Sequence, residues 1–74
     1  MSEEKIIAPM VGKVIKLNVK SGDQVKINQP VVVFESMKIE MDIMTPVDGT
    51  VKEIKVSPGQ VIEAEQVLLT IETL

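Results

Sequence analysis

Apolar and polar side chains alternate over short stretches of this chain, and turn residues separate the stretches. From residue 13 to residue 19 the alternation places Ile15, Leu17 and Val19 on one face, with a lysine and an asparagine between them on the other. A period of two is typical of a strand with one buried face. The segment Ser21-Gly22-Asp23 follows and predicts a turn.

Two other stretches are almost continuously apolar. Val31 to Phe34 and Val67 to Ile71 are short and rich in branched side chains, which indicates strands buried on both faces. No stretch of the chain has a helical period. The pattern therefore predicts an all-β protein.

The chain also matches itself, without a gap, when it is displaced by 37 positions. Neither half is long enough to bury an apolar face by itself. We therefore expect an all-β domain with pseudo-twofold symmetry, in which two similar four-strand halves interlock around one core. A single SH3-like barrel with a chance repeat is the alternative. The identical pairs include Ile6 and Ile43, Pro9 and Pro46, Gly12 and Gly49, Val14 and Val51, Val19 and Val56, Gly22 and Gly59, Gln29 and Gln66, and Glu35 and Glu72.

The size and composition of the chain limit its chemistry. Its 74 residues suffice for one domain, expected over residues 1–74 with an ordered core from about 6 to 72. Histidine, cysteine and arginine are all absent, which removes the usual general base, the thiol nucleophile and most zinc ligands. We therefore expect no catalytic and no metal-binding residues. The net charge of −3 argues against nucleic acid as a partner.

No stretch is apolar over the roughly 20 residues that span a bilayer. The segment from Met1 to Lys5 is short and polar, so it does not have the apolar core of a signal peptide. We expect a cytoplasmic protein without membrane insertion.

The junction between the two halves breaks a local rule. Strand patterns end near Glu35 and resume at Ile39, so Lys38 is predicted to lie at a tight reversal. The residues of this reversal include no Gly, Pro, Asn or Asp, which usually form hairpin turns. A rule broken without a structural gain is where function is expected.

At this junction the chain resembles the biotin carboxyl carrier (biotinyl) domains of the biotin/lipoyl attachment family. Residues 35–40, Glu-Ser-Met-Lys-Ile-Glu, are similar to the family motif Glu-Ala/Ser-Met-Lys-Met. Residues 8–12, Ala-Pro-Met-Val-Gly, and residues 45–49, Thr-Pro-Val-Asp-Gly, resemble two further family blocks. The likeness runs from about Ile6 to Ile71. Ile39 departs from it, because the family usually has Met there, and the gapless repeat leaves no room for the "thumb" loop of some bacterial carriers.

The resemblance implies a flattened eight-stranded β-barrel, a barrel-sandwich hybrid of two four-stranded sheets, with biotin attached covalently to Lys38. It also implies that a biotin protein ligase recognises the residues around that lysine, Glu35, Ser36, Met37 and Ile39. The domain would then carry a carboxyl group from a biotin carboxylase to a carboxyltransferase, within a biotin-dependent carboxylase or decarboxylase. It would be a carrier and not itself an enzyme.

Two other functions remain open at this point. A lipoyl carrier shares the fold and the hairpin lysine, but lipoyl domains usually have Asp-Lys-Ala at the tip, where this chain has Met37-Lys38-Ile39. An unmodified structural or adaptor barrel, as in some membrane-fusion proteins, leaves the Ser36-Met37-Lys38 segment without a role.

Overall fold

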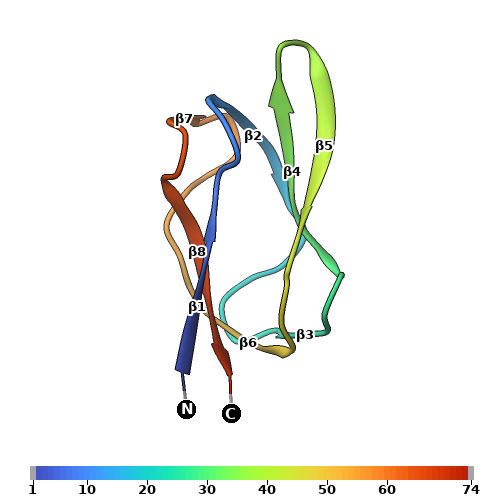
Figure 1. Cartoon of the computed structure of the whole chain (residues 1–74), viewed down its shortest axis with the longest axis vertical. Coiled ribbons are helices and arrows are strands. Elements are labelled where there is room, and N and C mark those ends of the chain that lie inside the picture. The colour runs from blue at the N-terminus through green and yellow to red at the C-terminus, as the bar shows by residue number, and fades with distance from the viewer. Residues whose placement is uncertain (1, 74) are drawn as a thin grey trace.

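A computed structural model describes residues 2–73, and these residues form eight strands and no helix. None of them therefore belongs to a helix that could cross a membrane. The chain is elongated, and the two described ends lie together at one extremity (Figure 1). The strands are β1 (Ser2–Ile7), β2 (Gly12–Leu17), β3 (Gln24–Val25), β4 (Pro30–Ser36), β5 (Ile39–Met44), β6 (Gly49–Ile54), β7 (Val61–Ile62) and β8 (Val67–Thr73).

The strands form two antiparallel four-stranded sheets, ordered β1-β8-β6-β3 and β5-β4-β2-β7. Each of the strands β1 to β4 has a counterpart in β5 to β8 at an offset of 37 residues, and both ends of every strand match. Applying that offset to one sheet order reproduces the other. Each sheet takes two strands from each half, so the predicted interlocked pseudo-twofold arrangement is confirmed.

The core lies between the sheets and is aliphatic except for one ring. Phe34 is completely buried, and it is the only aromatic residue of the chain. The two nearly continuous apolar runs, 31–34 and 67–71, lie within β4 and β8, as predicted. Their Val31, Leu68 and Ile71 are inaccessible to solvent. These strands are central because each has a neighbour on both edges.

The prediction that Ile15 lies on the buried face of β2 was wrong. The register between β2 and β4 shifts between Val14 and Lys16, so Ile15 is the extra residue of a β-bulge. Val14 is therefore fully buried, whereas Ile15 is only partly buried and is not among the core residues. The bulge recurs in β6, where the equivalent extra residue is the exposed Lys52.

Candidate functional site

The β4–β5 hairpin projects from the end of the molecule opposite to the chain ends (Figure 1). Its ladder runs from Pro30–Met44 at the base to Ser36–Ile39 at the tip. Met37 and Lys38 are the two residues between the strands. The tight reversal predicted at Lys38 is therefore present, and its side chain is exposed.

The backbone of this turn is unusual for its residues. Met37 and Lys38 have φ angles of 54° and 66°. Positive φ at both central residues is what a type I′ turn requires, and Asn-Gly normally supplies it. Each side chain with a Cβ in this region costs roughly 1–2 kcal/mol. The tip is thus held in a strained conformation by the ladder below it, as is common at functional sites.

Two exposed apolar side chains flank the lysine. Met37 is 88% exposed and Ile39 is 63% exposed. Met37 is the most exposed of the large apolar side chains that the structure describes. The lysine amine is therefore presented to solvent between two apolar side chains that contribute little to the core.

Ser36 lies differently from the other residues expected to contact a ligase. It is 6% exposed, and its Oγ donates a hydrogen bond of 2.7 Å to the carbonyl oxygen of Val11. The hydroxyl thus ties the tip of the hairpin to the loop between β1 and β2. A ligase approaching from solvent would reach the neighbours of Ser36 before its hydroxyl.

Glu35 is half-buried and lies directly opposite Glu40 in the ladder. Two carboxylates in opposite positions repel each other. At the equivalent position in the other half, Glu3 lies opposite Glu72, but there Lys52 Nζ donates to Glu3 Oε2 at 2.6 Å. In the hairpin half the residue equivalent to Lys52 is Ile15, which cannot form this ion pair.

The base of the hairpin packs closely on β2 because residue 12 is glycine. A Cβ at Gly12 would lie 2.7 Å from the ring of Phe34 and closer still to the carbonyl oxygen of Glu35. The buried ring and the glycine thus bring β2 against the hairpin. The sequence contained a signal for this contact, since Gly12 recurs at Gly49, but its partner could not be identified without the structure.

An open groove of about 840 Å³ lies at the far end, near the described termini. Its lining includes Lys26, Asp48 and Glu72 and no residue of the hairpin tip. The exposed lysine is therefore presented on a projection and not in a cleft.

Known proteins are similar to this chain in both sequence and fold. The family described as "Biotin-requiring enzyme" matches residues 4–71. The biotin carboxyl carrier protein of Streptococcus mutans is 45% identical over 64 residues, which are 86% of this chain and 49% of that protein. The mitochondrial pyruvate carboxylase of Mus musculus is 38% identical over 68 residues, which are 92% of this chain and 6% of that protein.

Among solved structures, the urea carboxylase of Kluyveromyces lactis superposes with a TM-score of 0.90 and 26% identity. The match covers 97% of this chain and 6% of that chain. This chain therefore spans about half the length of one relative and a small part of the others.

Proposed function

The chain belongs to the family of biotin-requiring enzymes, and on that premise we propose that Lys38 is the residue to which biotin is attached. The domain is a biotin carrier and not a catalyst, and its cofactor is biotin. The attachment point and the residues that a ligase contacts are the parts that we propose.

The observation that carries the proposal is the position of the Lys38 amine. It is exposed at the apex of the projecting hairpin, between Met37 and Ile39, and at the opposite end of the molecule from the described termini. An enzyme can approach such a tip from solvent without obstruction by the far end of the domain. The position also fits the group, because the exposed Lys38 at the turn between β4 and β5 would leave room for a covalent arm.

The attachment reaction would form an amide between Lys38 Nζ and the carboxyl carbon of biotin. The ligase has to supply an activated acyl group and to accept the proton that the amine loses when the amide forms. With biotinyl-adenylate as the donor, AMP is the leaving group. Bound biotin supplies the ureido nitrogen that carries the carboxyl group. The rigid sandwich then acts as the fixed end of a tether that raises the local concentration of that group at each active site.

We further propose that this chain serves a biotin carboxylase and a carboxyltransferase, either as separate subunits or as domains of one polypeptide. The relatives support this role, because they include a biotin carboxyl carrier protein and a pyruvate carboxylase. The proposal includes a cytoplasmic location, which fractionation of the source cells would test.

For ligase recognition we propose the four residues that flank the lysine, each with a role that its position supports. Met37 and Ile39 offer apolar contacts, Glu35 offers a half-buried carboxylate, and Ser36 holds the tip through its bond to Val11.

Co-expression of the chain with a biotin protein ligase tests the attachment site. Intact-mass measurement should show one added biotin, and peptide mapping should locate it on Lys38. The Lys38→Arg variant should fold normally and carry no label. Labelling of that variant would mean that the true site is one of the seven other lysines.

The same experiment separates the two alternative functions. A lipoyl group in place of biotin, after co-expression with a lipoate ligase, would identify a lipoyl carrier. No added mass with either ligase would favour an unmodified adaptor barrel.

A further inference from the structure

Because of the pseudo-twofold symmetry, a residue in one half of the domain can be compared with the residue at the equivalent position in the other half. Apart from Met37 and Lys38, whose counterparts lie outside the described residues, each residue near the hairpin tip has a counterpart, 37 positions away, in the equivalent strand or loop at the far end. The backbone hydrogen bonds repeat as well: the amide of Val14 bonds the carbonyl of Gln60, and the amide of Val51 bonds the carbonyl of Asp23. A difference in side chain between two such positions therefore does not reflect a difference in what the fold needs.

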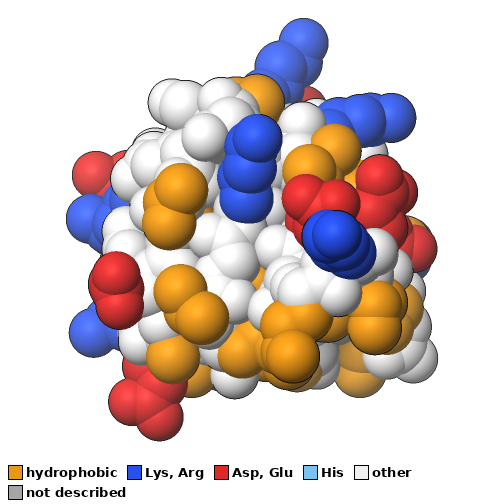
Figure 2. Space-filling view, turned by 90° about the horizontal axis from the view of Figure 1, so that it is seen from above, with side chains coloured by type: hydrophobic (Ala, Val, Ile, Leu, Met, Phe, Trp, Pro, Cys, Tyr) orange, Lys and Arg blue, Asp and Glu red, His pale blue; other side chains and the backbone are white. Residues whose placement is uncertain are grey.

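Two exposed positions beside the hairpin differ from their counterparts in the same sense. Val11 is 55% exposed and its counterpart is Asp48, while Val61 is 68% exposed and its counterpart is Gln24. Ile39 at the tip likewise corresponds to Ser2. The fold accepts polar residues at these places, yet the hairpin end has valine and isoleucine. Figure 2, which looks onto this end, shows apolar side chains exposed among charged ones.

The polar counterpart of Val11 also has a structural task that valine does not perform. Asp48 Oδ1 accepts a hydrogen bond of 2.7 Å from the amide of Ile27. At the hairpin end, the corresponding position 11 holds a side chain that cannot accept this bond. The hairpin end therefore gives up a hydrogen bond and exposes apolar surface instead, which indicates selection for something other than stability.

These two valines are also connected to the tip. The carbonyl of Val11 accepts the hydrogen bond from Ser36, the last residue of β4 before the turn. Val61 pairs with Lys13, and Lys13 pairs with Glu35, so Val61 lies in the same row of the sheet as the base of the tip. Neighbouring strands lie about 4.8 Å apart, and Val61 is two strands away from Glu35. One partner in a standard interface covers roughly 800 Å², an area wide enough to include both residues.

We propose that Val11 and Val61 belong to the surface that the biotin ligase contacts, together with Met37 and Ile39. This inference rests on the proposed function and extends recognition from the hairpin to the β1–β2 loop and β7. The occupant is a ligase because the enzyme that acylates Lys38 must approach its amine closely, and the valines adjoin that approach. Its contacting rim is expected to be apolar.

The counterparts define the variants that test this surface. Val11→Asn and Val61→Gln each introduce a neutral polar residue that resembles the one already accepted at the symmetric position. The matched control is Ile27→Gln, which removes a 56% exposed apolar side chain from the far end. Thermal unfolding followed by circular dichroism should show that all three variants fold.

Steady-state ligation with a purified biotin ligase and biotinyl-adenylate is the readout. The double variant Val11→Asn/Val61→Gln should lose about tenfold in kcat/KM, the size expected for two moderate contacts at an interface. Ile27→Gln should ligate at the wild-type rate. Wild-type ligation of a folded double variant would overturn the inference and leave the attachment proposal intact, whereas an unlabelled wild-type chain would reject the attachment proposal itself.

Discussion

The hairpin end and the terminus end of this domain have equivalent backbones and different surfaces. In one, β4 turns directly into β5 through Met37 and Lys38; in the other, the equivalent strands β8 and β1 carry the described ends of the chain. The pairing registers are the same, since Ser36–Ile39 corresponds to Thr73–Ser2. One fold therefore presents a strained, partly apolar projection at one end and paired strand ends at the other.

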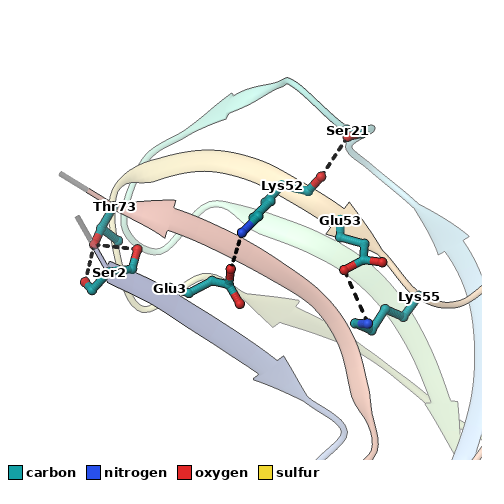
Figure 3. Close-up of polar contacts among 7 residues, drawn as sticks. All are labelled: Ser2, Glu3, Ser21, Lys52, Glu53, Lys55 and Thr73. Atoms are coloured by element: carbon teal, nitrogen blue, oxygen red, sulfur yellow. Dashed lines mark hydrogen bonds and ion pairs between the residues drawn. The ribbon is translucent and has the colours of Figure 1, made fainter.

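The polar contacts show the same contrast. Around the terminus end, Lys52 bonds Glu3, and the hydroxyls of Ser2 and Thr73 lie 2.6 Å apart (Figure 3). At the hairpin end, the opposed Glu35 and Glu40 have no counterpart of Lys52. Among the described residues, the ion pair of the terminus end thus has no equivalent at the hairpin end, where Lys13 lies opposite Glu35 in the ladder instead.

The largest effect is expected where the two ends are alike. Gly12→Ala would place a methyl group 2.7 Å from the ring of Phe34, and Gly49→Ala would place one 2.7 Å from Ile71 Cγ2. Each variant also presses on the carbonyl of the facing strand, which cannot move aside, so each should lose about 3 kcal/mol of stability. Urea unfolding followed by circular dichroism measures both. A loss at only one of the two glycines would break the equivalence of the halves.

Relieving the strained turn should give the next largest effect. Replacing Met37 and Lys38 by Asn and Gly supplies the residues that a type I′ turn prefers, so stability should rise by about 2 kcal/mol while the attachment site is lost. The control is Glu65→Asn. Glu65 has φ 69° and its counterpart Asn28 has φ 72°, so this variant should gain only about 0.5 kcal/mol. An unchanged urea midpoint for the double variant would show that the hairpin tip is not strained.

A smaller gain is expected at a buried hydroxyl. Thr70 is 3% exposed, and its Oγ1 has no hydrogen-bond partner among residues 2–73. Its counterpart in the other half is Val33. Because an unpaired buried hydroxyl is costly, Thr70→Val should stabilise the domain by about 1 kcal/mol. Urea unfolding tests this too, with Thr45→Val as the contrast: Thr45 Oγ1 donates to the carbonyl of Val47, so that variant should lose stability.

The smallest effect concerns the ion pair of the terminus end. The hydrogen bond and charge of Lys52 lower the pKa of Glu3, and those of Glu3 raise the pKa of Lys52. The contribution of Glu3 is therefore present above its ordinary pKa and lost as the pH falls through its lowered value. The contribution of Lys52 is present below its ordinary pKa and lost as the pH rises through its raised value.

Both side chains are exposed on the surface, so the effect is weak and screened by salt. Glu3→Gln should reduce the loss of stability between about pH 7 and about pH 3 in low salt. Glu40→Gln, at the equivalent hairpin position, has no such pair to lose. Equal changes in the acid dependence of unfolding for the two variants would remove this difference between the ends.

Much of the fold could be predicted because its determinants are local and repeated. Alternation and short apolar runs predicted the strands, and the gapless repeat predicted the pairing of halves. The reversal at Lys38 was predictable from two strand patterns that meet without turn residues. The inward placement of Ile15 was not, because a bulge depends on the register of the facing strand, and the sequence of one strand does not contain that register.

The sequence by itself determined the elements, their repetition and the lysine between them, since these depend on residue type and spacing. Only the tertiary structure decided that Ser36 bonds inward to Val11, that Met37 is nearly free of contacts, and that Val61 lies in the row that leads to the tip. These properties arise from contacts between segments far apart in the chain. The sequence supplies the side chains in which the two similar ends differ, and the tertiary contacts decide which of those side chains find partners and which are left exposed.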